Sequence, residues 1–159
     1  MNLFKAGLAG LLLAGALAGG ALADGIKGAP PPFDKGGVRI ALVSYLSQGD
    51  YFEAYEAGVA RQAKALGVDL RIFQGKQDAA QQREQIEQAI SLGVQGIIVS
   101  HGQPEAVKDV IQKALDAGIK VVVKDIDIGN PNVPQISHTS IIGNCGSLGV
   151  TRPPSVTAS

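Results

Sequence analysis

The stretch GVQGIIVSHGQPEAVKDVIQKALDAGIKVVV, residues 93–123, decides the fold class. Two short apolar runs, residues 96–99 and 119–123, are typical of parallel strands that are buried on both faces. Between them Pro104 opens a helix, because proline is tolerated in the first helical turn. Apolar residues then recur every three or four positions, as expected for the buried side of a helix: Val107, Val110, Ile111, Ala114 and Leu115. Gly118 ends this helix.

The same alternation extends toward the N-terminus. Residues 38–43 form an apolar, β-branched run, and residues 50–66 have helical spacing, with an apolar side made of Phe52, Tyr55, Val59, Ala63 and Leu66. Residues 68–73 alternate apolar and charged side chains, which favours an edge strand. Residues 77–92 predict another helix, with Asp78 as its N-cap and a glutamine-rich, solvated face.

The resulting order, β-α-β-α-β-α-β, predicts an α/β fold: a three-layer structure with a parallel sheet and right-handed crossovers. The chain has 159 residues, the length of a single ordinary domain. Its formal net charge is zero, which argues against a nucleic-acid partner or an anionic membrane surface.

The first 23 residues are interpreted as a secretory signal peptide. Lys5 precedes a glycine-rich apolar run, and Ala21 and Ala23 form a small-x-small cleavage site before Asp24. A transmembrane anchor is the alternative, but the run is shorter than the ~20 residues that a span needs. No cysteine lies near the cleavage site, so the sequence does not suggest a lipid anchor. Residues 24–37, which contain three consecutive prolines, are expected to form an extended flexible linker, and the mature protein is expected in the periplasm.

In a parallel α/β sheet, ligands bind beyond the carboxyl ends of the strands. Three loops are expected to face one crevice there: residues 44–50, 100–103 and 124–128. The loop at residues 74–77 would lie apart, at the sheet edge. Asp125 can accept hydrogen bonds from the hydroxyl groups of a ligand, and Tyr51 and Phe52 can offer a flat apolar face. The polar candidates at the same rim are Ser44, Gln48, Asp50, Ser100 and Gln103.

Each candidate has a structural alternative. Phe52 lies on the apolar stripe of its helix and is expected there to pack in the core. Asp125 can instead pair with Lys124 or cap a turn, and Asp50 can be a helix N-cap. His101 and His138 have no partners spaced for a metal ion, so solvent exposure is expected for both and no metal site is predicted.

The common catalytic and cofactor motifs are missing. The chain contains no Gly-x-Ser-x-Gly sequence and no Walker-type loop, and the loop after the first strand lacks the dinucleotide-binding glycines. A Gly-x-x-Gly-x-x-Gly spacing at residues 143–149 is not followed by a helical pattern, and Cys145 is the single cysteine. We therefore expect no enzymatic activity and no cofactor.

The chain resembles the N-terminal lobe of the type I periplasmic solute-binding proteins, the ribose/galactose-type sugar binders of ABC importers. The resemblance covers about residues 38–137. It rests on residues 40–43 with the polar loop after them, on Tyr51 and Phe52, and on Gly58. It also rests on residues 66–68, 85–86, 93–99 and 117–123 and on Asp125.

The resemblance implies a clamshell of two α/β lobes with the solute between them. It further implies that Tyr51 and Phe52 stack on a sugar and that Asp125 binds its hydroxyl groups. The arginine that often follows the aspartate is replaced by Ile126, and Gln48-Gly49 stands where an asparagine pair is common. These departures leave the identity of the solute open.

Residues 138–159 differ in character from the rest of the chain. They carry one charged residue, Arg152, and a proline pair, and show no helical stripe. In the family the chain would continue here into a second lobe of similar size. We therefore interpret this segment as an atypical tail from a truncated or frameshifted gene, which is too short to complete the clamshell. A short strand at residues 140–142 is the alternative.

The sequence therefore predicts a periplasmic binder of a small polar solute, with a sugar favoured, that works with the membrane permease of an ABC importer. A sensory lobe that presents its solute to a receptor is one alternative. A flavodoxin-like enzyme with Asp125 or Asp127 as a catalytic residue is the other.

Overall fold

The structure is a computed structural model that describes residues 25–137. The predicted signal peptide at residues 1–23 lies outside the described residues. So does the predicted tail at residues 138–159, with His138, Cys145 and the possible strand at residues 140–142.

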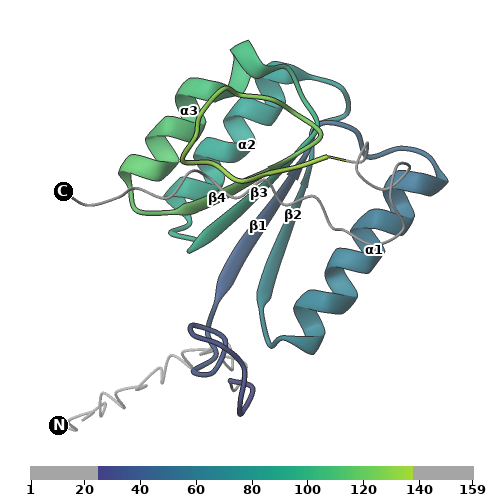
Figure 1. The fold of residues 1–159 in the computed structure, drawn as a ribbon. Helices are drawn as coiled ribbons and strands as arrows, with labels where there is room; N and C mark the ends of the chain where they lie inside the picture. Colours follow the sequence, from purple (N-terminus) through teal and green to yellow (C-terminus); the bar gives the residue numbers. More distant parts are fainter. Residues whose placement is uncertain (1–24, 138–159) are drawn as a thin grey trace, which may run out of the picture.

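The described residues form a five-stranded parallel sheet with the strand order β2-β1-β3-β4-β5 (Figure 1). The strands are β1 (Arg39–Ser44), β2 (Asp69–Gln74), β3 (Gly96–Ser100), β4 (Lys120–Lys124) and β5 (Gln135–Ile136). The predicted parallel α/β architecture is confirmed, and β2 is an edge strand, as its alternating pattern indicated. The two-residue strand β5 was not predicted.

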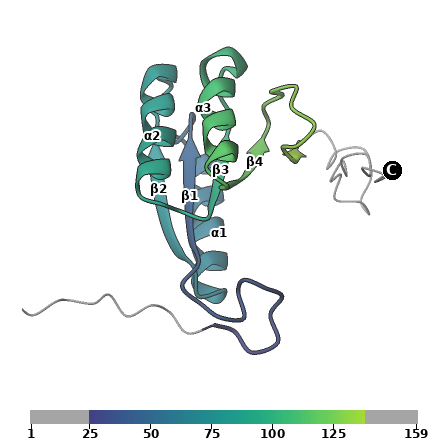
Figure 2. The same ribbon diagram turned by 90° about the vertical axis from the view of Figure 1, so that its left-hand side faces the viewer.

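Three helices complete the layers: α1 (Asp50–Ala65), α2 (Ala79–Ser91) and α3 (Pro104–Asp116). Helices α2 and α3 lie side by side on one face of the sheet, and α1 lies on the other (Figure 2). This arrangement is the predicted three-layer structure. Because β1, β3 and β4 are neighbours in the sheet, the loops that follow them begin at adjacent strand ends.

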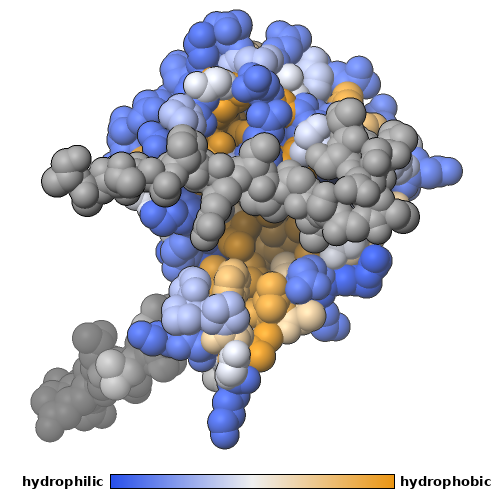
Figure 3. Space-filling view, in the orientation of Figure 1, coloured by the Kyte–Doolittle hydropathy of each residue, from blue (hydrophilic) through white to orange (hydrophobic). Residues whose placement is uncertain are grey.

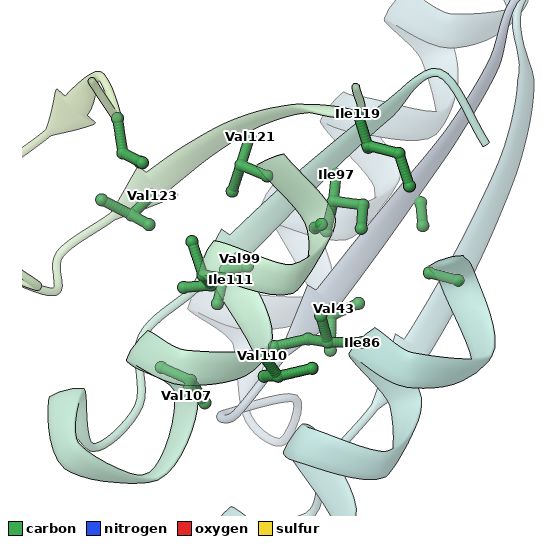
Figure 4. Close-up of a cluster of buried hydrophobic side chains, with 14 of the residues drawn as sticks. Val43, Ile86, Ile97, Val99, Val107, Val110, Ile111, Ile119, Val121 and Val123 are labelled. Carbon is green, nitrogen blue, oxygen red and sulfur yellow. The ribbon is translucent and has the colours of Figure 1, made fainter. Parts of the chain in front are cut away.

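The main core lies between the sheet and helices α2 and α3. Alternate residues of β1, β3 and β4 point to this side and meet Ile86 of α2 and Ile111 of α3, both fully buried (Figure 4). The strand residues in this cluster are Ala41, Val43, Ile97, Val99, Val121 and Val123. The apolar stripe predicted for residues 104–115 is confirmed by this packing.

The N-termini of α1 and α2 confirm one prediction and correct two others. Asp78 caps α2, as predicted, and accepts a hydrogen bond from the amide of Gln81 at 3.0 Å. The helix begins at Ala79 rather than at residue 77, because Lys76 and Gln77 have left-handed backbones with φ of 51° and 63°. Gly49 is the N-cap residue of α1, so the interpretation of Asp50 as an N-cap is wrong.

Residues 25–37 form a loop of turns, not the extended path that was predicted. The amide of Ile26 donates to the carbonyl of Phe33 at 3.0 Å, and the amide of Phe33 donates to the carbonyl of Pro30 at 3.0 Å. The turns bring the Phe33 side chain against the sheet beside Ile40.

An apolar groove lies on the α1 side of the sheet, next to this loop. We define it by the side chains that line it: Phe33, Ile40, Val59, Leu66, Val68, Leu70 and Ile98. Figure 3 shows apolar surface over this part of the molecule. Within residues 25–137, no helix is long and apolar enough to cross a membrane.

Candidate functional site

The sheet ladder extends one residue beyond β1, β3 and β4. The amide of Tyr45 donates to the carbonyl of Ser100 at 2.9 Å, and that of His101 donates to the carbonyl of Lys124 at 2.8 Å. The amide of Asp125 donates to the carbonyl of Ile136 at 2.8 Å. The residue that follows each of these strands is thus fixed to the neighbouring strand, and the three predicted site loops leave the sheet side by side.

Asp125 is the centre of a polar cluster at these strand ends. Its Oδ2 atom forms an ion pair with the Nζ of Lys124 and lies 3.4 Å from the Nε2 of His101. The side chains are 12%, 13% and 16% exposed, respectively. His101 and Asp125 both have left-handed backbones, with φ of 56° and 54°, which is uncommon for residues other than glycine. The structure therefore shows the pairing of Asp125 with Lys124 that the sequence left open.

The prediction that His101 is exposed to solvent is wrong. Its ring packs edge-on against Phe52 at a centroid distance of 5.3 Å, and its Nδ1 lies 3.0 Å from the hydroxyl of Ser100. The sheet order is the physical reason, because it places the residue after β3 next to the residue after β4. No histidine spacing in the sequence encodes that neighbourhood.

Aromatic rings from the first turns of α1 form one wall of the cluster. Tyr51 and Phe52 pack edge to face at a centroid distance of 5.1 Å. Tyr51 is 49% exposed. Phe52 is half-buried and packs against the rings of Tyr51 and His101, on the α1 side of the sheet and outside the main core. The ammonium group of Lys124 lies over the ring of Tyr55, 4.9 Å from its centre. It lies 5.6 Å from the centre of the Tyr51 ring.

Ser44 and Ser100 do not lie at an exposed rim, contrary to prediction. Each is 1% exposed. They stand in register with Lys124 across three strands, which places all three side chains on the α1 side of the sheet. The phenol of Tyr55 lies next to Ser100, and burial is the main reason that the pKa of Tyr55 is raised above its ordinary value. The serines therefore form a layer beneath the aromatic wall.

Three other predicted residues are exposed around the cluster: Gln48, Asp50 and Gln103. The Nε2 atom of Gln103 donates to the hydroxyl of Tyr45 at 3.4 Å, which links the loop after β3 to the loop after β1. Gln48 and Asp50 lie just before and at the start of α1, within the loop region that carries Tyr51. All three remain predictions as ligand contacts.

Gln82 holds the main chain at His101 in place through a hydrogen bond, and the sequence did not predict this role. It lies on α2, is 0% exposed, and donates from Nε2 to the carbonyl of His101 at 2.9 Å. The glutamine-rich face of this helix was predicted to be solvated, which is wrong for Gln82. Gly102 leaves room for its amide: a Cβ atom on Gly102 would lie 2.4 Å from the Oε1 of Gln82.

Lys124 and Tyr55 are the other members of the cluster that sequence reasoning did not select. Tyr55 was placed on the apolar stripe of α1, and Lys124 was considered as a partner of Asp125 but not as a site residue. The available signal was the position of Lys124, a charged residue at the end of an otherwise apolar strand. Among residues 25–137, no group of three or more His, Cys, Asp or Glu side chains is arranged to hold a metal ion.

Comparison with known proteins identifies the family. The sequence profile of the periplasmic binding protein domain matches residues 40–141, well over half of the chain. The D-apiose import binding protein of Paraburkholderia graminis is 30% identical over 105 residues, which are 66% of this chain and 33% of that protein. The chain therefore spans about a third of the length of this relative.

Solved structures agree in fold. The 5-methylthioribose transporter solute-binding protein of Thermotoga lettingae, in complex with 5-methylthioribose, has a TM-score of 0.64 and 38% identity, covering 66% of this chain and 33% of that one. LsrB of Clostridium saccharobutylicum, in complex with AI-2, has a TM-score of 0.57 and 26% identity, covering 63% and 31%. The matched residues 40–141 include every described helix and strand except the first residue of β1, so the chain belongs to the periplasmic binding protein domain family.

Proposed function

We propose that this protein binds a small polar solute, a sugar or a sugar derivative, at the cluster around Asp125, as part of uptake by an ABC importer. The observation that carries the proposal is that an exposed aromatic ring, Tyr51 at the start of α1, and the carboxylate of Asp125, after β4, both contact the ammonium group of Lys124. Small polar ligands are commonly held between an apolar wall and a few placed polar groups. Proteins similar to this one are named for D-apiose and 5-methylthioribose.

The residues have different proposed roles. Tyr51 and Phe52 provide the face against which the apolar side of a sugar ring packs, and Asp125 accepts hydrogen bonds from its hydroxyl groups. Gln48, Asp50 and Gln103 are exposed and add polar contacts at the rim. Ser44 and Ser100 are buried and act as a support for the wall.

The cellular context is proposed from the family and the sequence together. Residues 1–23 direct the chain to the periplasm, residues 24–37 connect them to the fold, and residues 38–137 form the solute-binding lobe. The solute then passes to the membrane subunits of an ABC permease. The protein has no chemistry of its own in this scheme.

The test is an NMR titration of the ¹⁵N-labelled protein with D-apiose, 5-methylthioribose and D-ribose at up to tens of millimolar. An NMR assay suits the question because it detects weak binding. We expect amide shifts at residues 51–52, 100–103 and 125. Asp125→Asn should weaken binding roughly tenfold or more, since hydrogen bonds to charged groups contribute about 1.5–3 kcal/mol.

The matched control is Asp127→Asn, because Asp127 lies in the same loop but is exposed and accepts a hydrogen bond from the amide of Gly129. Its affinity should stay within twofold of the wild type. The proposal fails if none of the three sugars shifts these amides, or if Asp125→Asn and Asp127→Asn bind equally well.

A further inference from the structure

The ammonium group of Lys124 lies in the proposed site between the carboxylate of Asp125 and the phenol oxygen of Tyr51. Lys124 is the last residue of β4, and its side chain is 13% exposed. The side chain points to the α1 side of the sheet, as those of Ser44 and Ser100 do. Nζ pairs with the carboxylate of Asp125 and lies 3.4 Å from the hydroxyl of Tyr51. The rings of Tyr51 and Tyr55 lie close to it, as cation–π partners do.

The position of this cation determines the charge that a solute meets. A carboxylate that is 12% exposed, without a cation, would attract positively charged solutes and lose hydration at the same time. With Lys124 beside it, the pair is neutral overall. Asp125 can still accept hydrogen bonds, while its attraction for a cation is offset at close range.

The contacts of Lys124 also hold it in place. Its Nζ meets the carboxylate of Asp125 and the phenol oxygen of Tyr51, and the ring of Tyr55 covers it. The phenol of Tyr55 in turn lies next to the buried Ser100. A cation held in this way stays beside Asp125 and does not swing out toward solvent.

We infer that Lys124 is a specificity-determining residue, which balances the charge of Asp125 so that the site selects uncharged polyhydroxylated solutes over solutes that carry an amino group. The inference rests on the proposed function, because it assigns the solute class of the same site. It adds a role that neither Asp125 nor the aromatic wall can supply, since neither carries a positive charge.

The test compares each neutral sugar with its amino counterpart: D-glucose with D-glucosamine, and D-galactose with D-galactosamine. Dissociation constants are measured by NMR titration at neutral pH for the wild type and for Lys124→Met. We expect the ratio of amino-sugar to neutral-sugar affinity to rise roughly tenfold to a hundredfold in Lys124→Met, because a close, poorly solvated charge loses its counter-ion. General damage to the fold would weaken both sugars together and leave this ratio unchanged.

Two variants complete the design. Lys120→Met makes the same change on the same strand and the same face, but at the exposed amino end of β4, and should leave the ratio within threefold of the wild type. Lys124→Arg keeps the positive charge and should restore most of the neutral-sugar preference. A ratio that stays constant in Lys124→Met, or that rises equally in Lys120→Met, overturns the inference.

The two proposals fail in different ways. If the wild type binds none of the neutral sugars, including those of the previous section, sugar binding is refuted. Charge balancing is then decided by D-glucosamine alone. Lys124→Met should acquire shifts at residues 51–52 and 125 that are absent from the wild type, and no gain refutes the inference.

Discussion

Gly102→Ala should destabilise the protein in two ways, through backbone strain and through a clash with Gln82. Gly102 has a φ of 134°, a backbone region that residues with a side chain rarely adopt, and a new Cβ would meet Oε1 of Gln82 at 2.4 Å. The backbone term costs on the order of 1–3 kcal/mol. Displacing the buried amide breaks its hydrogen bond to the carbonyl of His101, which costs about 1 kcal/mol more. The expected loss of unfolding free energy is therefore about 2–4 kcal/mol.

Gly118→Ala is the matched control. Gly118 also has a positive φ, 78°, but a Cβ there would meet no atom within 4 Å. Its cost should be the left-handed backbone penalty alone, about 1–2 kcal/mol. Both variants are measured by urea unfolding followed by circular dichroism, with the m-value checked for constancy.

A double-mutant cycle isolates the contact. In a Gln82→Ala background the clash is gone, so Gly102→Ala should cost only its backbone term, and the coupling energy should be about 1 kcal/mol or more. If Gly102→Ala costs the same with and without Gln82, the two residues do not touch and the account of how His101 is positioned is wrong.

The remaining predictions concern the core and the half-buried phenol of Tyr55. Ile111→Ala should lower the free energy of unfolding by about 2–5 kcal/mol, because Ile111 is 0% exposed between α3 and the sheet, whereas Lys113→Ala on the exposed side should change it by less than about 0.5 kcal/mol in the same urea assay. Tyr55 has a raised pKa because it is buried, so its contribution to stability is complete below pH ~10 and is lost as the pH rises through its folded pKa. Tyr55→Phe should therefore remove the last of the three tyrosine ionisations in absorbance at 295 nm and flatten the alkaline loss of stability; an unchanged alkaline profile would contradict the burial of this phenol.

The regular part of the fold could be predicted from the sequence because its signals are local. The apolar runs at residues 96–99 and 119–123, and the helical stripe between them, record burial directly in residue type. The strand ends fell within a residue or two of prediction. Strand β5 has only two residues, too few for any periodic pattern to appear.

The site could be predicted only in part, because its geometry depends on which strands become neighbours. Asp125 and the wall residues Tyr51 and Phe52 were found from their positions after strands. The burial of His101 and the support from Gln82 were not, since both arise from contacts between separate elements. A glutamine among other glutamines carries no local sign that it alone is buried.

The sheet ladder has a consequence for how the proposed solute site can be varied. Tyr45, His101 and Asp125 each follow a strand, yet their amides are still part of the sheet ladder. The hydrogen bonds that hold the main chain do not depend on these side chains, but the left-handed backbones of His101 and Asp125 favour a few residue types, mainly glycine, asparagine, aspartate and histidine. A combinatorial library confined to residues 51, 101, 124 and 125 would therefore vary the proposed site on a fixed frame, with a restricted choice of residues at positions 101 and 125.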